Sequence, residues 1–399
     1  MNDDKKVALP TGSRLRTLGE GDLLLLIYLF NIVAAVVEFT VKVGVRGPNW
    51  AFGYMALVFV VETIIYALGM ALVFFTSVQL GAKLRLVAIL IGWIPGINLV
   101  VVALTLSKTI PEFLFEMKKL RLDRKRHEDQ ICKTKYPIVM VHGIFFRDFR
   151  YLNYWGRIPA ELERNGAAIY YGEQESAEPV EKSAGKVYDR IRRLVEETGC
   201  EKVNIIAHSK GGLDTKYAIA CMGMDRYVAS VTTINTPHRG CEFAEYLLDT
   251  IEEPVQETIA GTYNSVLKKM GDKSPDFIRA VTDLTASRCS AISDMCDRFD
   301  YKEAGIYTQS FGSCMKKARS GAFPLDMSYK LVKKFDGEND GLVGEASFKW
   351  GEDYKFLRNK YDRGISHGDM IDLNRENIKG FDVREFYVDL VSGLKARGL

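Results

Sequence analysis

The sequence predicts an α/β domain, built on a mostly parallel sheet with helices on both faces, that follows a segment of three membrane-spanning helices. Three long apolar runs fill the N-terminal quarter, and from Tyr136 onward short apolar strands alternate with helical patterns. The averages hide this division, because 47% hydrophobic residues, 26% charged residues and a mean hydropathy of −0.06 describe an ordinary soluble protein. They exclude a disordered chain, and a net charge of +3 does not indicate a nucleic-acid partner.

The apolar runs each approach the length of about 20 residues that a helix needs to cross a bilayer. Because apolar and polar residues do not alternate in them, helices are expected rather than the strands of a barrel. The alternatives are buried core helices or a signal peptide, but a signal peptide has only one short apolar core. The expected spans lie within 23–107, after a tail of residues 1–22, and cover 23–41, 51–75 and 86–106.

Two details of the spans bear on their packing. Pro95-Gly96 should kink the third span. Glu62 lies in the middle of the second span, where a carboxyl group is either functional or packed inside a small helical bundle. We favour the packed interpretation, because carboxyl groups within a membrane usually face the bundle interior.

A basic linker, residues 108–135, follows the spans with nine Lys and Arg against five Asp and Glu. Its densest part, 118–126, predicts either a helix beside anionic headgroups or a solvated connector. Three spans place the two termini on opposite sides, and this basic cluster favours the cytoplasmic side for the large domain. All seven cysteines lie between Cys132 and Cys314 without a pairing frame, which agrees with a reducing compartment.

The large domain covers residues 136–399. Short apolar runs typical of buried strands are 136–141, 167–171, 202–207 and 229–234, and helical patterns occupy 181–198 and 210–222. This alternation predicts a mostly parallel sheet. Functional groups in such a sheet gather at the carboxyl ends of the strands.

Ser209 follows one of these strands directly and precedes a helix. The pattern Ala207-x-Ser209-x-Gly211 is a variant of the sharp strand-to-helix turn that presents a nucleophilic serine. Small residues are needed two positions before and two after the serine, because the strand and helix backbones pass closely there. Ala207 replaces the usual first glycine, which is a mild departure.

His367 is the candidate general base. The chain has five histidines, and a Ser…Asp…His chain order requires one that comes late, which only His367 does. The alternative is an ordinary surface-loop histidine. Asp340, in an Asn-Asp-Gly turn at an expected strand end, is the best placed acid to orient it, ahead of Asp300, Asp326, Asp336, Asp353 and Asp362.

Backbone N–H groups would bind the oxyanion in such a site. One is expected from Lys210, which follows the nucleophile at a helix N-terminus, and the other from Ile144, after the His142-Gly143 turn.

These motifs resemble those of bacterial triacylglycerol lipases of the α/β-hydrolase superfamily, the Pseudomonas and Burkholderia type. The matching segments occur in the family's order and are 137–143, 207–212, 235–240, 339–343 and 367–369. The resemblance implies an α/β-hydrolase fold, with Ser209 as nucleophile, Asp340 as acid and His367 as base. It also implies that Ile144 and Lys210 form the oxyanion hole.

The resemblance further implies a structural calcium ion, although the chemistry itself requires no cofactor. Asp369, two residues after the candidate base, and Asp326 would be its carboxylate ligands. The spacing of Asp326 to Asp340 is shorter than in the family, and the alternative is two solvated loop acids.

Two features depart from the family. The family is mostly secreted, whereas three expected spans precede the catalytic part here. Lys210 stands where an apolar or amide residue is commoner, and its charge could favour an anionic ester such as a phospholipid. The insertion 241–299, with helical patterns at 245–251 and 277–284, is either a lid that opens at a lipid surface or a plain helical cap.

The sequence as a whole predicts a membrane-anchored serine hydrolase that cleaves carboxylic esters of lipids, in the plasma membrane of a bacterium. An acyltransferase or thioesterase on the same triad is a second interpretation. A non-catalytic membrane scaffold with a relic hydrolase fold is a third, which the complete triad opposes. The expected partners are a lipid or ester substrate and the membrane, with no prediction of the oligomeric state.

Overall fold

The computed structural model describes residues 12–144, 154–174, 177–250, 276–322 and 325–399, together with a few positions between 252 and 265. The chain divides into two compact units between His127 and Glu128. Helix α4 (Ile97–Arg126) continues through most of the basic stretch before the second unit begins.

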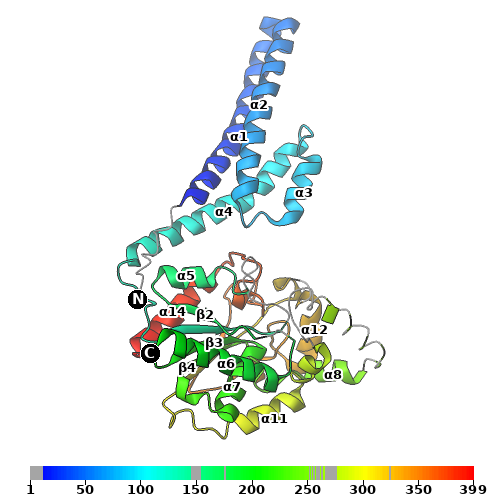
Figure 1. Ribbon diagram of the computed structural model, residues 1–399. Helices are drawn as coiled ribbons and strands as arrows, with labels where there is room; N and C mark the ends of the chain where they lie inside the picture. Colours follow the sequence, from blue (N-terminus) through cyan, green and yellow to red (C-terminus); the bar gives the residue numbers. More distant parts are fainter. Residues whose placement is uncertain are drawn as a thin grey trace. The chain divides into compact units, whose positions relative to one another are not determined.

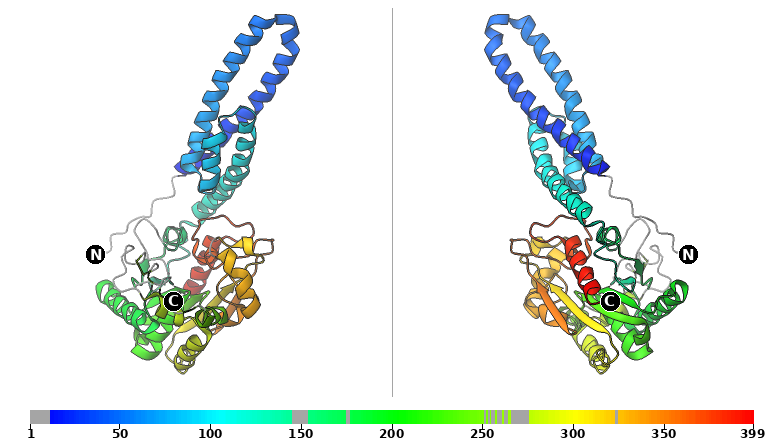
Figure 2. Two further views of the ribbon diagram at one scale, coloured as in Figure 1. Left: turned by 90° about the vertical axis from the view of Figure 1, so that its right-hand side faces the viewer. Right: turned by 90° about the vertical axis from the view of Figure 1, so that its left-hand side faces the viewer.

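The N-terminal unit consists of two helical hairpins (Figure 1). Helices α1 (Ser13–Arg46) and α2 (Pro48–Thr76) form the first, and α3 (Gly81–Ile91) and α4 form the second. Figure 2 shows that α1 and α2 extend well beyond the second hairpin. The shared core includes Leu18, Leu25, Tyr28, Met70, Val73, Val101 and Val102.

Many apolar side chains of this unit face outward. Phe52 and Phe75 of α2 are 80% and 91% exposed, and Val45 of α1 is 87% exposed. An apolar surface of this extent is compatible with insertion into a membrane. Glu62 of α2 is buried, as expected for a carboxyl group packed within the bundle.

Three helices are long and apolar enough to cross a membrane, namely α1, α2 and α4. The first two contain the expected spans 23–41 and 51–75. The third expected span, 86–106, is wrong as a single kinked helix, because α3 ends at Ile91 and α4 begins at Ile97. Pro95 lacks an N–H, and Gly96 has a φ of 85°, which permits a complete reversal instead of a kink.

The second unit is built on a six-stranded sheet with the order β2-β1-β3-β4-β5-β6, in which all neighbours are parallel. The strands are β1 (Ile138–Val141), β2 (Ile169–Tyr171), β3 (Val203–His208), β4 (Val228–Ile234), β5 (Tyr307–Ser313) and β6 (Asp353–Leu357). The first four coincide with the expected strands to within two residues. The last two were not predicted from the sequence.

Helices cover both faces of this sheet. Met140 and Ile206 face the layer of α5 (Ile158–Arg164) and α14 (Val383–Ala396). Val139 and Ile205, one residue earlier on the same strands, face α6 (Val180–Thr198) and α7 (Lys210–Met222). This alternation is the reason that both faces of the strands are apolar, and it confirms the predicted α/β class.

The insertion after β4 contains α8 (Glu242–Thr250), α10 (Phe277–Thr282) and α11 (Ala286–Cys296). Cys289 and Ile292 of α11 pack against Leu213 of α7, so this part of the insertion contributes to the core. Most of 251–275, in the middle of the predicted lid, lies outside the described residues. Helices α12 (Leu325–Asp336) and α13 (Glu345–Phe348) lie between β5 and β6 in the chain.

Candidate active site

Ser209 occupies the turn between β3 and α7, where the sequence places it. Its backbone has φ 55° and ψ −132°, a conformation that L-residues rarely adopt. The Ser209 N–H donates to the carbonyl oxygen of Ile234 on β4 at 2.9 Å, which anchors the turn to the sheet. This is the sharp strand-to-helix geometry that holds a serine hydroxyl at the edge of a sheet.

Two glycines permit the close packing around this turn. A Cβ at Gly211 would lie 2.5 Å from the carbonyl oxygen of His142, so the start of α7 meets β1 without space for a side chain. A Cβ at Gly143 would lie 2.7 Å from the Cβ of Ser209. The His142-Gly143 turn therefore passes directly beside the serine, as an oxyanion loop must.

Asp340 and His367 form a hydrogen-bonded pair. The Nδ1 of His367 donates to Oδ2 of Asp340 at 2.6 Å, and the backbone N–H of His367 donates to the carbonyl oxygen of Asp340 at 2.9 Å. Because the carboxylate accepts the hydrogen bond from Nδ1–H, Nε2 is the nitrogen of the neutral ring that can accept a proton. The side chains of both residues are buried.

The imidazole of His367 lies beside the serine turn. Its ring centroid is 4.5 Å from that of His208, the residue immediately before Ser209. The structure thus brings the three residues chosen from the sequence to one edge of the sheet, at the carboxyl ends of its strands.

Asp340 is reached by a different element from the one expected. It follows helix α12 rather than a strand, in a turn closed by the bridge between Asn339 and Gly344. The carbonyl oxygen of Asn339 accepts from the N–H of Met315 at 2.8 Å, which holds this turn against the end of β5.

Asn235 is a site residue whose role sequence reasoning missed, although it was part of a matched motif. Its Nδ2 donates to Oδ2 of Asp340 at 2.6 Å and to the hydroxyl of Ser313 at 2.8 Å. The other carboxylate oxygen, Oδ1, accepts from the N–H groups of Leu342 and Val343, both at 2.9 Å. The position of Asn235 directly after a buried strand is the one signal that could have indicated this role.

Tyr154 is a second residue that the sequence did not indicate. Its hydroxyl oxygen lies 3.0 Å from the N–H of Gly143, from which it accepts, and 2.7 Å from Nδ1 of His208. Burial, together with the proximity of His367, holds the pKa of His208 well below its usual value. His208 is therefore neutral, and it packs beside the candidate base without competing for the proton that the base is to accept.

The two expected oxyanion donors lie at suitable places. The N–H of Lys210 is the first of α7, among the groups that have no partner within the helix. Ile144 is buried and packs with Ala280 of α10, so the insertion covers the oxyanion loop at this point. Residues 145–153, which continue that loop, lie outside the described residues.

The side chain of Lys210 does not serve the purpose considered for it. Its ammonium group is buried and donates to Oδ1 of Asp214 at 2.6 Å and to the hydroxyl of Ser183 at 3.1 Å. Burial raises the pKa of Asp214 to about 7, against the lowering effect of Lys210. The ammonium group of Lys210 is thus buried and held by Asp214 and Ser183, which removes the argument that its charge selects anionic esters.

The residues expected to bind calcium do not fit that ion. Oδ1 of Asp369 accepts from the guanidinium of Arg363 at 3.1 Å, and Oδ2 accepts from the N–H of Ser366 at 2.8 Å. Asp326 accepts from the N–H of Met327 in the first turn of α12. Calcium would need the carboxylate oxygens that the cationic Arg363 and the loop backbone already engage. We therefore derive no step through a metal ion.

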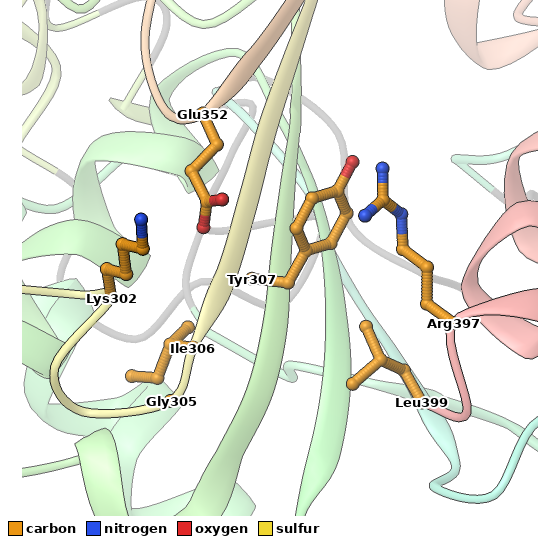
Figure 3. Close-up of a pocket in the computed structure, with 7 residues that line it drawn as sticks. All are labelled: Lys302, Gly305, Ile306, Tyr307, Glu352, Arg397 and Leu399. Atoms are coloured by element: carbon orange, nitrogen blue, oxygen red, sulfur yellow. The ribbon is translucent and has the colours of Figure 1, made fainter.

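A surface pocket of about 290 Å³ lies elsewhere in this unit (Figure 3). It is lined by Lys302, Gly305, Ile306, Tyr307, Glu352, Arg397 and Leu399. Tyr307 begins β5, so the pocket is at the amino end of the sheet, opposite the edge that carries Ser209. Its lining includes no serine, cysteine or histidine, and it does not compete as the site of a nucleophile.

A parallel sheet with helices on both faces and a serine in the sharp turn between β3 and α7 give this unit the α/β-hydrolase fold. In sequence, the chain is similar to bacterial triacylglycerol lipases. The triacylglycerol lipase of Pseudarthrobacter phenanthrenivorans is 29% identical over 202 residues, which are 48% of this chain and 60% of that protein. The triacylglycerol lipase of Vibrio cholerae is 29% identical over 287 residues, 67% of this chain and 90% of that protein.

The chain thus spans less than two thirds of the first of these relatives. Among solved structures, that of Staphylococcus hyicus lipase aligns with 66% of this chain and 97% of its own, at 17% identity and a TM-score of 0.49. No protein-family model matches the chain.

Proposed function

We propose that this protein is a serine hydrolase that cleaves carboxylic esters of lipids at a membrane. The observation that carries the proposal is the His367–Asp340 pair, with a 2.6 Å hydrogen bond, packed against the strained turn of Ser209. The similarity to triacylglycerol lipases supports esters of fatty acids as the substrate class.

Catalysis proceeds through an acyl-enzyme. Nε2 of His367 takes the proton of the Ser209 hydroxyl as its oxygen attacks the ester carbonyl carbon, and Asp340 stabilises the imidazolium. The imidazolium then returns the proton to the leaving alcohol as the tetrahedral intermediate collapses. Water, deprotonated by His367, attacks the acyl-enzyme, and the fatty acid leaves as Ser209 regains its proton.

The developing oxyanion is bound by backbone groups. The N–H of Lys210 is fixed by the helix that begins there, and the N–H of Ile144 by the turn beside Gly143. Because these groups are held in place before the reaction, they stabilise the transition state without reorganising. The loss of one such donor typically lowers kcat by about 100-fold to 1,000-fold.

The N-terminal unit anchors the enzyme beside its insoluble substrate. Its outward-facing apolar side chains support insertion into a lipid bilayer, which we assign to the plasma membrane of a bacterium. Anchoring raises the local concentration of lipid esters around the active site, so a modest intrinsic affinity suffices.

The test is hydrolysis of a panel of soluble esters and membrane lipids by the purified full chain. The wild type is expected to release fatty acid from several substrates, and Ser209→Ala is expected to lose nearly all of this activity. Ser230→Ala serves as the matched control, since Ser230 is also buried but bonds to Asn204, away from the site. Retained activity in Ser209→Ala, with loss in neither variant, would refute the proposal. Added alcohol acceptors separate hydrolysis from acyl transfer in the same assay.

A further inference from the structure

The second helical hairpin has short apolar arms. Helix α4 is long enough as a whole to cross a membrane, but its charged residues begin at Lys108. Helix α3 has 11 residues, which at 1.5 Å per residue makes it about 16 Å long. The apolar part of α4, residues 97–106, has a length of about 15 Å. The hydrocarbon core of a bilayer is about 30 Å thick, so both arms reach about halfway through it.

A buried carboxylate fixes the depth at which α4 leaves the membrane. Glu112 of α4 is 1% exposed and accepts from Arg14, at the start of α1, at 2.8 Å. It also accepts from the hydroxyl of Ser77, just after α2, at 2.6 Å and from the N–H groups of Val78 and Gln79. Position 112 is therefore level with the end where α1 begins and α2 finishes.

The contacts along α1 show that α4 runs in the opposite direction from this level. The hydroxyl of Thr109 donates to Asp22 at 2.5 Å. Thr109 precedes Glu112 in α4, whereas Asp22 follows Arg14 in α1, so the two helices are antiparallel. Deeper still, Val101 and Val102 share a core with Leu25 of α1. The start of α4 is thus its deepest point, and residues after Glu112 lie outside the apolar layer.

The tip of the hairpin is built to lie among apolar groups. In the turn 92–96, the N–H groups of Gly92 and Ile94 donate to carbonyl oxygens three or four residues earlier in the chain. The N–H of Gly96 donates to the side chain of Asn98. Pro95 has no N–H, and the indole of Trp93 donates to the carbonyl oxygen of Leu90 at 2.8 Å while its ring is 72% exposed. In an apolar environment without water, polar groups must form their hydrogen bonds within the protein, as these do.

The distribution of charges indicates on which side of the membrane the start of α1 and the end of α2 lie. Lys42 and Arg46 lie at the far end of the first hairpin. The near end carries many more cations, namely Arg14, Arg16, Lys83, Arg85, Lys108, Lys118, Lys119, Arg121, Arg124, Lys125 and Arg126. Lysine and arginine near the ends of spans accumulate on the cytoplasmic side.

We propose that the chain crosses the membrane twice, through α1 and α2, and that the α3–α4 hairpin enters only the cytoplasmic leaflet and turns back. The start of α1 and the hydrolase unit then share the cytoplasmic side, because α4 continues from Glu112, beside Arg14, to Arg126 away from the apolar layer. Three complete spans would put them on opposite sides. The inference rests on the membrane insertion proposed above and is independent of the hydrolytic activity.

Single-cysteine labelling of the full chain tests this topology. Cys221 is the exposed native cysteine of the described residues and reports the side of the hydrolase unit. In a Cys200→Ser, Cys221→Ser background, the added probes are Arg16→Cys near the start of α1, Asn49→Cys at the far turn and Trp93→Cys at the tip. A membrane-impermeant maleimide is applied to intact cells and to inverted membrane vesicles, and a melting temperature unchanged from that of the wild type shows that each variant is folded.

We expect Cys221 and Arg16→Cys to react only in inverted vesicles, Asn49→Cys only on intact cells, and Trp93→Cys in neither until detergent is added. Reaction of Cys221 and Arg16→Cys from opposite sides, or of Trp93→Cys on intact cells, would overturn the two-span topology. Extraction of the wild-type chain by alkaline carbonate would instead refute the membrane insertion on which the topology rests, and would leave the hydrolase assignment standing.

Discussion

The carboxylate of Asp340 accepts four hydrogen bonds, one each from the His367 ring, Asn235 and two backbone N–H groups. Of these donors, Asn235 shares Oδ2 with His367, so it determines how that oxygen faces the imidazole. We expect Asn235→Ala to lower kcat by about tenfold to 100-fold, since a hydrogen bond to a charged group contributes about 1.5–3 kcal/mol. KM should change little, because Asn235 does not reach the substrate, and steady-state kinetics on a soluble ester measures both constants.

Asn204→Ala is the control for this prediction. Asn204 is equally buried in the sheet, but its side chain bonds to Ser230 and to the carbonyl oxygen of Tyr136. It should lose stability without losing kcat. Equal losses of kcat in the two variants would mean that Asn235 acts only through the stability of the fold.

Lys210 and Asp214 form a buried ion pair, and the loss of one partner leaves the other charge without compensation. Because the raised pKa of Asp214 lets its carboxyl take up a proton, Lys210→Met should lower the free energy of unfolding by about 1–3 kcal/mol, and the double variant with Asp214→Leu should recover part of this loss. Denaturant unfolding measures both. The ratio of activity on anionic and neutral esters should stay unchanged, and a clear fall in that ratio would restore a role for the lysine charge in substrate selection.

At the residue scale, the sequence predicted the positions of Ser209, Asp340 and His367 because each lies in a short motif with a fixed chain order. Tyr154 and Asn235 could not be assigned roles, because their contacts join segments that are far apart in the chain. The ion pair of Lys210 was missed for another reason. A charged residue beside a nucleophile suggests a contact with substrate unless its buried partner is known.

At the level of elements, the crossing of β1 and α7 depends on Gly211. A Cβ there would meet the carbonyl oxygens of His142 and Val141 at 2.5 and 2.7 Å, and backbone atoms cannot yield as a flexible side chain can. We expect Gly211→Ala to cost about 1–3 kcal/mol of stability and to displace the serine turn, with a loss of kcat. Ala207→Gly, which restores the usual glycine, should leave the activity intact. A fully active Gly211→Ala variant would contradict the close crossing.

The loop that carries His367 is held by an arginine. Arg363 donates to Asp369 at 3.1 Å and to Glu376 at 2.6 Å, so a cation of the chain itself bridges two acidic residues. Treatment with a calcium chelator should leave both the ester hydrolysis and the melting temperature unchanged. Arg363→Met should lower the melting temperature. Loss of activity on chelation, reversed by added calcium, would contradict this account.

The polar residues and the partial exposure of β5 and β6 are the reason that the sequence did not predict these two strands. β5 buries Thr308, Ser310 and Ser313, whose hydroxyl groups find partners inside the protein, so no apolar run marks it. β6 lies at the edge of the sheet and is partly exposed, and it therefore lacks the continuous apolar pattern of a central strand. Neither strand can be predicted from its own residues, because contacts with distant parts of the chain stabilise both of them.

For the whole molecule, composition separated an apolar N-terminal unit from a hydrolase-like unit, and the structure divides the chain within the predicted basic stretch, between His127 and Glu128. Composition alone could not distinguish a kinked span from a helix, a turn and a second helix, because both give one uninterrupted apolar run over 86–106. The contacts of Glu112 with Arg14 and of Thr109 with Asp22 show which part of α4 lies level with the start of α1.

The central claim is that Ser209 is a nucleophile activated by His367. Labelling of the full chain with a fluorophosphonate, followed by mass spectrometry of the peptides, tests it most directly. We predict one adduct, on Ser209, formed rapidly in the wild type and much more slowly in His367→Ala. Absence of an adduct on Ser209 in the folded protein, or labelling of Ser209→Ala at the wild-type rate, would contradict the account.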